Sequence, residues 1–169
     1  MAVTGNPTLR LIGNVLWVAP GGFVMAVLWC CAGVLCALSL IGIPWVRGCF
    51  NIALFVLWPF GRVAISRQVL TGQDDIGTGI WGLIGNAIWL VLLGIWLALA
   101  HVALALICAI TIIGIPFAWQ HLKLAGVALA PIGVAIVDAP VAEEARRRAA
   151  AAELDRMRGY TKPRSQRLV

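Results

Sequence analysis

Charged side chains are scarce in this sequence: 12% of its 169 residues are Asp, Glu, Lys or Arg, while 62% are hydrophobic. A typical soluble domain has about 25% charged and roughly 45–50% apolar residues. With 13 basic and 7 acidic side chains, a soluble domain of this length lacks the polar groups needed to cover its surface. The composition therefore excludes a disordered chain and most soluble enzyme folds, and it indicates an integral membrane protein.

Groups that serve catalysis or nucleotide binding are also few. The chain has 2 histidines, and it shows neither a Ser/His/Asp arrangement nor a phosphate-binding glycine motif. The adjacent acids Asp74 and Asp75 lie in a polar stretch that is typical of a solvated turn. We therefore expect no enzyme, no cofactor and no bound nucleic acid.

The 5 cysteines all lie inside apolar runs, and an odd count without extracellular spacing favours buried free thiols over disulfides. A metal site is the alternative, because Cys30, Cys31 and Cys36 fall within two helical turns. No second Cys or His pair follows nearby to complete such a site.

Most of the charge is concentrated in the C-terminal tail. Asp138–Val169 holds 8 of the basic and 5 of the acidic residues. Alternating acidic and basic blocks in Val141–Arg158 predict a solvated helix with salt-bridged faces. A basic cytoplasmic face beside anionic lipid explains the net charge of +6 without invoking nucleic acid.

The sequence repeats itself after 72 residues. Leu11–Gly61 aligns without a gap to Leu83–Gly133, and 17 of the 51 aligned positions are identical. The shared elements are a Leu-Ile-Gly-Asn-x-x-Trp opening, an Ile-Gly-Ile-Pro centre and a Pro-x-Gly close, which indicate a tandem duplication. The repeated motif residues are Asn14, Trp17, Gly42, Pro44, Asn86, Trp89, Gly114 and Pro116.

The sequence of each copy predicts a hairpin of two membrane spans. We therefore expect an all-α integral membrane protein with four transmembrane helices. The expected spans are 22–43, 45–61, 92–115 and 117–137. The chain is thereby divided into a first membrane repeat (8–62), a cytoplasmic loop (63–79), a second membrane repeat (80–137) and a basic cytoplasmic tail (138–169).

Basic residues predict the orientation. With four spans, Arg10, the 63–79 loop and the tail lie on one side, and the positive-inside rule places that side, with both termini, in the cytoplasm. Arg47 and Lys123 lie beyond the Ile-Gly-Ile-Pro turns and oppose this orientation. Two spans per copy also predict parallel copies, related by an axis along the membrane normal.

Taken together, the two Asn-x-x-Trp openings, the Thr-Ile-Ile-Gly-Ile-Pro centre at 111–116 and the Trp-Pro-Phe-Gly-Arg close at 58–62 resemble the YccF family of bacterial inner-membrane proteins. The resemblance covers about residues 8–137 and implies a small multi-pass protein with two inner-membrane component domains. It implies no established activity. The second close, Ala-Pro-Ile-Gly-Val at 130–134, departs from the pattern.

Polar residues inside the predicted spans are the candidate functional residues. His101 is either a neutral, hydrogen-bonded imidazole or a group linked to proton or solute movement. Lys123 either extends its ammonium group to the interface or joins Gln120, Asn51 and Arg47 in a polar path for an anionic solute, with Trp119 placed for a cation–π contact.

The repeated motif residues have structural interpretations. Asn14 and Asn86 suit helix N-capping or hydrogen bonding between the copies. Trp17, Trp89, Trp45 and Trp58 suit an interfacial aromatic belt. In the central turns, glycine supplies backbone freedom and proline restarts a helix.

Two functions remain open at this point. The first is a non-catalytic membrane component of a homo-oligomer or of an assembly with a larger inner-membrane partner, packed through small residues such as Gly33, Ala37, Ala109 and Gly126. The alternative is a small oligomeric transporter or channel whose polar path lies near His101 and Lys123.

Overall fold

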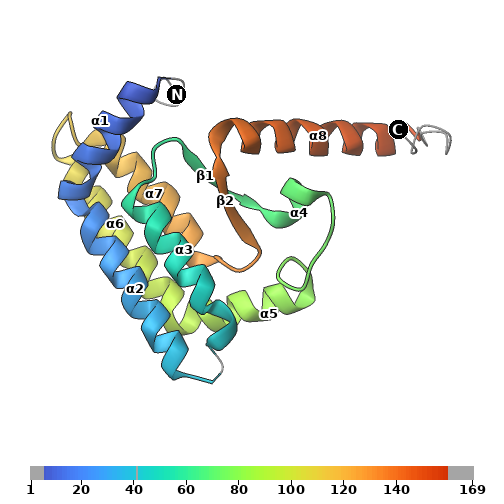
Figure 1. Cartoon of the computed structure of the whole chain (residues 1–169), viewed down its shortest axis with the longest axis horizontal. Helices are drawn as coiled ribbons and strands as arrows, with labels where there is room; N and C mark the ends of the chain where they lie inside the picture. Colours follow the sequence, from blue (N-terminus) through green and yellow to red (C-terminus); the bar gives the residue numbers. More distant parts are fainter. Residues whose placement is uncertain (1–5, 41, 160–169) are drawn as a thin grey trace.

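A computed structural model describes residues 6–40 and 42–159. The first copy contains α1 (Pro7–Trp17), the π-helical turn η2 (Val18–Gly22), α2 (Phe23–Leu38), the 3₁₀ turn η3 (Ile43–Trp45), α3 (Val46–Leu57), β1 (Arg62–Ser66) and α4 (Arg67–Thr71). The second contains α5 (Ile80–Trp89), the π-helical turn η4 (Leu90–Gly94), α6 (Ile95–Ala109), α7 (Ile115–Leu129), β2 (Val134–Asp138) and α8 (Ala139–Met157) (Figure 1). The elements of the two copies correspond at the 72-residue offset of the sequence repeat, except that the second copy has no separate counterpart of η3, whose equivalent residues begin α7.

Two helical hairpins form the body of the molecule. In each copy the first long helix, α2 or α6, packs against the returning helix, α3 or α7. Their facing side chains are apolar and join one core, whose largest fully buried members include Trp17, Met25, Trp29, Trp89 and Leu124. Pro44 and Pro116 stand in the first turn of the returning helical segments, as their position in the motif predicts.

The glycines of the central turns are required for close packing. Gly42 and Gly114 have ordinary right-handed backbone angles, with φ −82° and −77°. A Cβ on Gly42 would lie 2.6 Å from the Cα of Cys36, and a Cβ on Gly114 would overlap the carbonyl oxygen of Cys108. The expectation that these glycines supply backbone freedom is therefore wrong. Ile41 of the first motif lies outside the described residues.

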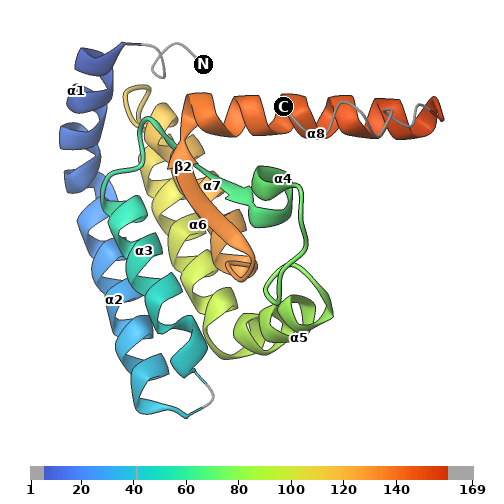
Figure 2. The ribbon, with the colours of Figure 1, turned by 45° about the vertical axis from the view of Figure 1, so that its right-hand side comes forward.

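The two copies run in opposite directions, so the expectation of parallel copies is wrong. The Cys108 thiol in the last turn of α6 lies 3.6 Å from the Pro20 carbonyl oxygen, just before α2 begins. Helices α2 and α6 are in contact. Figures 1 and 2 show that they run in opposite directions, with the two hairpin turns at opposite ends of the body. A sequence repeat specifies the fold of each copy, whereas their relative direction depends on how they pack.

The returning helices are shorter than the spans that the sequence predicted. Helices α3 and α7 contain 12 and 15 residues, about 18 and 22 Å of helix, against a hydrocarbon core of about 30 Å. Each helix ends before the Pro-x-Gly close, where Gly61 and Gly133 adopt φ +96° and +87°. These left-handed conformations favour glycine and turn the chain from helix into strand.

A two-stranded antiparallel sheet follows the returning helices, so the chain is mostly helical but not all-α. Strand β1 lies in the segment expected to be a loop, and β2 occupies residues expected to end the last span. Ala64 pairs with Ile136, its own equivalent in the other copy. The sheet therefore lies on the pseudo-twofold axis that relates the copies. The β-branched residues of Val-Ala-Ile-Val at 134–137 suit a strand as well as a helix in an apolar context.

Basic segments meet at one end of the body. Ala139 N, at the start of α8, donates to Gly61 O at 2.9 Å, and Arg62 is paired with Asp138 in the sheet. A Cβ on Gly61 would lie 3.0 Å from the side chain of Arg10. Arg10, β1 and the start of the charged tail are therefore neighbours, while α8 extends away from the body (Figure 2).

Candidate functional site

A break in the first long helix creates the most unusual polar site in the body. Within η2, Pro20 and Gly21 leave helical geometry, and Gly21 has φ +129°. A side chain at position 21 would be strained and would also lie 2.8 Å from Leu104 and 3.0 Å from Nε2 of His121. The equivalent turn η4 has no such break, so this site exists once in the molecule as described.

His101 and His121 form a buried pair beside this break. Their Nδ1 atoms lie 3.0 Å apart, and neither side chain is exposed. Nε2 of His121 lies 3.4 Å from the Pro20 carbonyl oxygen, and the Trp17 ring covers His121 with 4.4 Å between ring centroids. The pair connects α6 and α7 of the second copy to the broken helix of the first.

The hydrogen-bonding partners determine the tautomers of the neutral pair. The Pro20 carbonyl can only accept, so His121 donates through Nε2 and its Nδ1 becomes an acceptor. His101 must then donate through Nδ1, which leaves a lone pair on its Nε2. The pair therefore ends on a buried nitrogen whose lone pair has no partner among the described residues.

Sequence reasoning identified His101 and missed His121. The two histidines align with Trp29 and Cys49 in the first copy, so the repeat does not mark either as part of a shared motif. Their separation of 20 residues crosses the Gly114–Pro116 turn, and only the hairpin geometry brings them together. One usable signal was that both histidines of the chain lie in predicted spans.

The repeated Asn and Trp residues hold each copy together internally. Trp17 Nε1 donates to Val56 O at 2.7 Å, and Trp89 Nε1 donates to Ala128 O at 2.8 Å. Because Trp17 and Trp89 are fully buried, their assignment to an interfacial belt is wrong. Trp45 is half-buried and Trp58 is exposed.

Asn14 and Asn86 also act within their own copies. Each side chain bonds the backbone of the Pro-x-Gly close, at Phe60 and Ile132 respectively. Asn14 lies in the last turns of α1, whose N-cap is Asn6. Both earlier interpretations, N-capping and bonding between copies, are therefore wrong.

The remaining candidate polar residues do not share one path. Lys123 is exposed on α7, with Nζ 6.0 Å from the centroid of the Trp119 ring, while Gln120 is buried. Arg47 and Asn51 lie on α3 and line a separate cavity. The structure thus separates His101, Lys123 and the Arg47–Asn51 pair into three locations.

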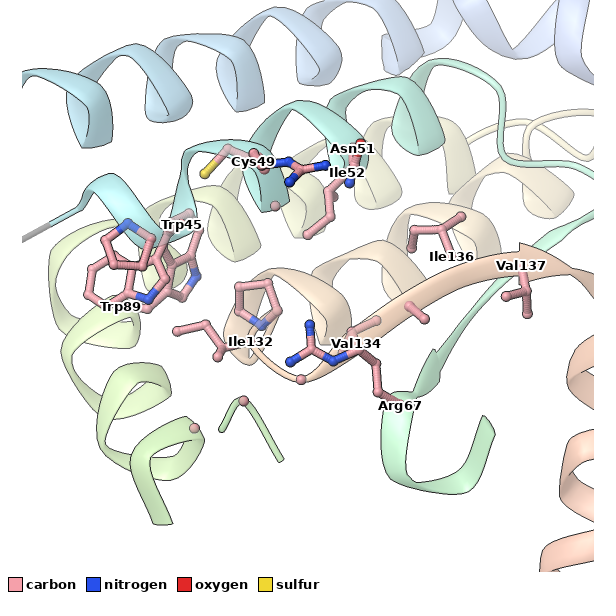
Figure 3. Close-up of a pocket in the computed structure, with 18 of the residues that line it drawn as sticks. Trp45, Cys49, Asn51, Ile52, Arg67, Trp89, Ile132, Val134, Ile136 and Val137 are labelled. Carbon is pink, nitrogen blue, oxygen red and sulfur yellow. The ribbon is translucent and has the colours of Figure 1, made fainter. Parts of the chain in front are cut away.

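The cavity has a volume of about 1140 Å³ and lies between α3, α5 and the β2 strand. Figure 3 shows Asn51 and Ile52 on one wall, Arg67 and Val134 on the opposite wall, and Trp45 and Trp89 at one end. Three arginines line it, Arg47, Arg62 and Arg67, against one lining carboxylate, Asp138. The cavity is therefore positively charged with aromatic and aliphatic walls.

Ion pairs outside the helical body lower the pKa of two carboxyl groups. The Arg67 guanidinium donates to Asp75 at 2.8 Å and lowers the pKa of that carboxyl, with help from the backbone N–H groups of Gly77 and Thr78. On α8, hydrogen bonds from Arg148 and Arg147 lower the pKa of Glu144. The i,i+3 and i,i+4 pairs on α8 agree with the predicted salt-bridged helix.

Three of the cysteines, Cys36, Cys49 and Cys108, are buried, whereas Cys30 is half-buried and Cys31 is exposed. All five are free thiols. The expectation of buried free thiols therefore fails in part, at Cys31. Within residues 6–40 and 42–159, no group of three or more His, Cys, Asp or Glu side chains is arranged to hold a metal ion.

Comparison with known proteins agrees with the membrane character of the helices. Two described helical stretches, Pro7–Leu38 and Ile80–Ala109, are long and apolar enough to cross a membrane. The chain is 33% identical over 141 residues to the inner membrane protein YccF of Escherichia coli K12, covering 82% of this chain and 94% of the relative. The Shigella flexneri protein of the same name matches to the same extent.

No solved structure matches this chain significantly. The family model described as an inner membrane component domain matches twice, at residues 12–62 and 84–134, with the 72-residue offset of the internal alignment. The two copies, the apolar helices and these matches agree, and the chain belongs to the YccF family of inner membrane proteins.

Proposed function

We propose that this protein is a non-catalytic component of the bacterial inner membrane that acts in a homo-oligomer or with a larger membrane partner. The observation that carries the proposal is that α5 projects from the helical body (Figure 1). Its side chains Ile80, Trp81 and Leu83 are each about two-thirds exposed, at 65%, 68% and 67%. An apolar helix face without an internal partner offers a surface for another membrane helix.

The proposed layout has four membrane helices, α2, α3, α6 and α7, as two hairpins, with both termini cytoplasmic. Because the hairpins are antiparallel, residues 62–94 and 130–138 also connect the two ends of the body in this layout. Arg10, β1 and the start of α8 lie at the same end of the body. This proximity supports the proposal that both termini lie on the same side of the membrane. The short returning helices favour local thinning of the bilayer around the body.

Labelling of single cysteines in a cysteine-free chain tests this layout. With intact cells, Ala150→Cys in α8 is expected to react only after the membrane is made permeable. Ser39→Cys and Thr111→Cys report on the two turns, which the antiparallel copies place at opposite ends. Reaction of position 150 in intact cells would contradict the cytoplasmic tail.

The assembly is tested by purification in mild detergent, with native mass as the readout. We expect a species larger than the monomer, and Leu83→Asn in α5 is expected to reduce it to the monomer. Leu99→Asn in α6, at a similarly exposed apolar position, is the matched control and is expected to leave the assembly intact. A strictly monomeric wild type without a co-purifying protein would contradict the proposal.

A small oligomeric transporter is the second candidate, and a specific observation favours it. Antiparallel copies, a broken helix and a polar site at their contact are features of secondary transporters. Here the break at Pro20 accepts from His121, and His121 accepts from His101. When a proton binds Nε2 of His101, the Nδ1 proton of His101 can move to Nδ1 of His121. His121 must then release its Nε2 proton to water, because the Pro20 carbonyl accepts a hydrogen bond but not a proton.

Proton movement into liposomes that contain a trapped pH dye tests the second candidate. The wild type is expected to dissipate an imposed pH gradient faster than protein-free liposomes do. His101→Gln is expected to abolish this difference, whereas Lys123→Ala, on the exposed face of α7, is expected to retain it. Equal rates for wild-type and empty liposomes would reject the transport hypothesis.

A further inference from the structure

We propose that the cavity between α3, α5 and β2 binds the phosphate headgroup of an anionic phospholipid, with part of its acyl chain along the aromatic wall. This inference does not depend on whether the protein acts in an assembly or as a transporter. It concerns the arginine-lined cavity, defined by Arg47, Asn51, Arg62, Arg67 and its apolar walls.

The lining of the cavity carries more positive than negative charge. Arg67 is already paired, because its Nε lies 2.7 Å from Oδ2 of Asp75. In contrast, Arg47 and Arg62 make no ion pair among the residues that the structure describes. Asp138 stands opposite Arg62 in the sheet and contributes one negative charge to the lining. The lining therefore retains excess positive charge after its internal partners are counted.

Arg47 is a charged residue in an apolar body. Arg47 lies in the first turn of α3, four residues before Asn51, so both side chains share one helical face. A guanidinium at membrane depth is costly unless it reaches the interface or meets a counter-charge. The cavity provides the space for such a counter-charge beside Arg47, and Asn51 adds a neutral donor to the same wall.

The walls of the cavity match a ligand that has both a phosphate and a hydrocarbon chain. Guanidinium groups match the geometry of phosphate oxygens and form charge-assisted hydrogen bonds with them. The other walls are apolar and include Trp45, Trp89 and Ile132, with Trp29 and Trp89 stacked at 5.6 Å between ring centroids. Trp81 and Ile76 line the cavity and are largely exposed. A phosphate attached to a hydrocarbon chain would pair with the arginines and also contact the apolar walls, whereas a free anion would pair with the arginines only.

The probes are short-chain phosphatidylglycerol with brominated acyl chains, its phosphatidylcholine counterpart and inorganic phosphate. Delipidated protein in detergent is titrated with each, and quenching of tryptophan fluorescence reports contact between the bromine atoms and the tryptophans. For inorganic phosphate, the readout is displacement of the brominated phosphatidylglycerol. We expect saturable quenching by phosphatidylglycerol, at least tenfold weaker binding of phosphatidylcholine, and displacement by phosphate only at far higher concentration.

Four variants test whether the lipid binds in this cavity. Arg47→Gln and Arg62→Gln are each expected to weaken phosphatidylglycerol binding about tenfold or more, since each removes a charged donor. Arg146→Gln, in the exposed tail helix, is the matched control and is expected to bind as the wild type does. Arg47→Lys, which retains the charge, is expected to recover part of the lost affinity and guards against a folding defect in Arg47→Gln.

Three outcomes would overturn the proposal. The first is equal affinity for phosphatidylglycerol and phosphatidylcholine, which would remove the role of charge. The second is displacement by inorganic phosphate at concentrations equal to those of the lipid, which would indicate a free-anion site. The third is wild-type affinity in both Arg47→Gln and Arg62→Gln, which would place the lipid elsewhere on the protein.

Discussion

The Asn14 side chain and the backbone of Phe60 form a reciprocal pair of hydrogen bonds. Phe60 N donates to Asn14 Oδ1 at 2.9 Å, and Asn14 Nδ2 donates to Phe60 O at 3.1 Å. Asn86 repeats both bonds with Ile132, at 3.0 Å each. In each copy this contact joins the first helix to the turn that follows the returning helix. The motif asparagine therefore closes its hairpin.

Asn14→Ala is expected to destabilise the protein by about 2–4 kcal/mol, because it leaves both backbone groups of Phe60 without a partner in a partly buried site. The free energy of unfolding can be measured by titrating the detergent-solubilised protein with denaturing detergent. Asn51→Ala, at an exposed position on α3, is the control and is expected to change it by less than about 0.5 kcal/mol. Equal stability of the two variants would show that the reciprocal bonds contribute nothing.

Trp17→Phe tests the indole hydrogen bond separately from the aromatic packing. The change keeps an aromatic ring beside His121 but removes the Nε1–H donor to Val56 O, which is 2.7 Å away. We expect a loss of about 1–3 kcal/mol, to which the missing donor and the smaller ring both contribute. Trp81→Phe, on the exposed α5, is the matched control. A Trp17→Phe variant as stable as Trp81→Phe would contradict the role given to this bond.

The sequence predicts the copies well because it repeats the residues that build each one. The Asn, Trp, Gly and Pro of the motif occupy equivalent places in both copies, and family membership follows from the same residues. The apolar character of the helices is likewise a property of composition. The sequence pattern predicts that these residues lie in helices, but it does not predict which side chains they contact. For this reason the pattern favours the membrane interface for Trp17, although the residue is buried.

Contacts between the copies could not be predicted, because they depend on residues that the repeat does not share. His101 and His121 align with Trp29 and Cys49, and the helix break at Gly21 has no counterpart in η4. The antiparallel direction follows from tertiary packing and from the β1–β2 pairing, neither of which leaves a periodic signal in an apolar run. The arginine-lined cavity likewise requires residues from several elements of both copies.

A disulfide across the sheet tests the antiparallel arrangement. Ala64 and Ile136 face each other in the register of β1 and β2. Cysteines at directly opposed positions have Cβ atoms about 4.5–5.5 Å apart, which is close enough for oxidation to join them after small shifts. In a cysteine-free chain, Ala64→Cys with Ile136→Cys is expected to cross-link on mild oxidation, as measured by a mobility change that a reductant reverses.

The control for this cross-link moves one cysteine to the other face of the sheet. Val63→Cys with Ile136→Cys places the two thiols on opposite faces, since neighbouring residues of a strand alternate in direction. This pair is expected to remain reduced under the same conditions. Cross-linking of both pairs at equal rates, or of neither, would contradict the β1–β2 register, which is one of the observations that support antiparallel copies.

The Arg67–Asp75 ion pair predicts a pH dependence of stability. The Asp75 carboxyl has a lowered pKa because Arg67 donates to it, so the folded protein holds the charged form more strongly than the unfolded chain does. The resulting stabilisation is present above the ordinary aspartate pKa and is lost as the pH falls through the lowered value. Thermal unfolding in detergent should therefore show the wild type to be more stable than Arg67→Gln at neutral pH, with the difference shrinking in acid.

Asp74→Asn separates this effect from a general loss of negative charge in the same turn. Asp74 is exposed, and among the described residues it makes no ion pair, so its substitution is expected to leave the pH profile unchanged. Because Arg67 and Asp75 are both about 40% exposed, the effect of Arg67→Gln is expected to be modest and to weaken as salt is added. A difference between wild type and Arg67→Gln that grows as the pH falls would have the wrong sign and would contradict the assignment.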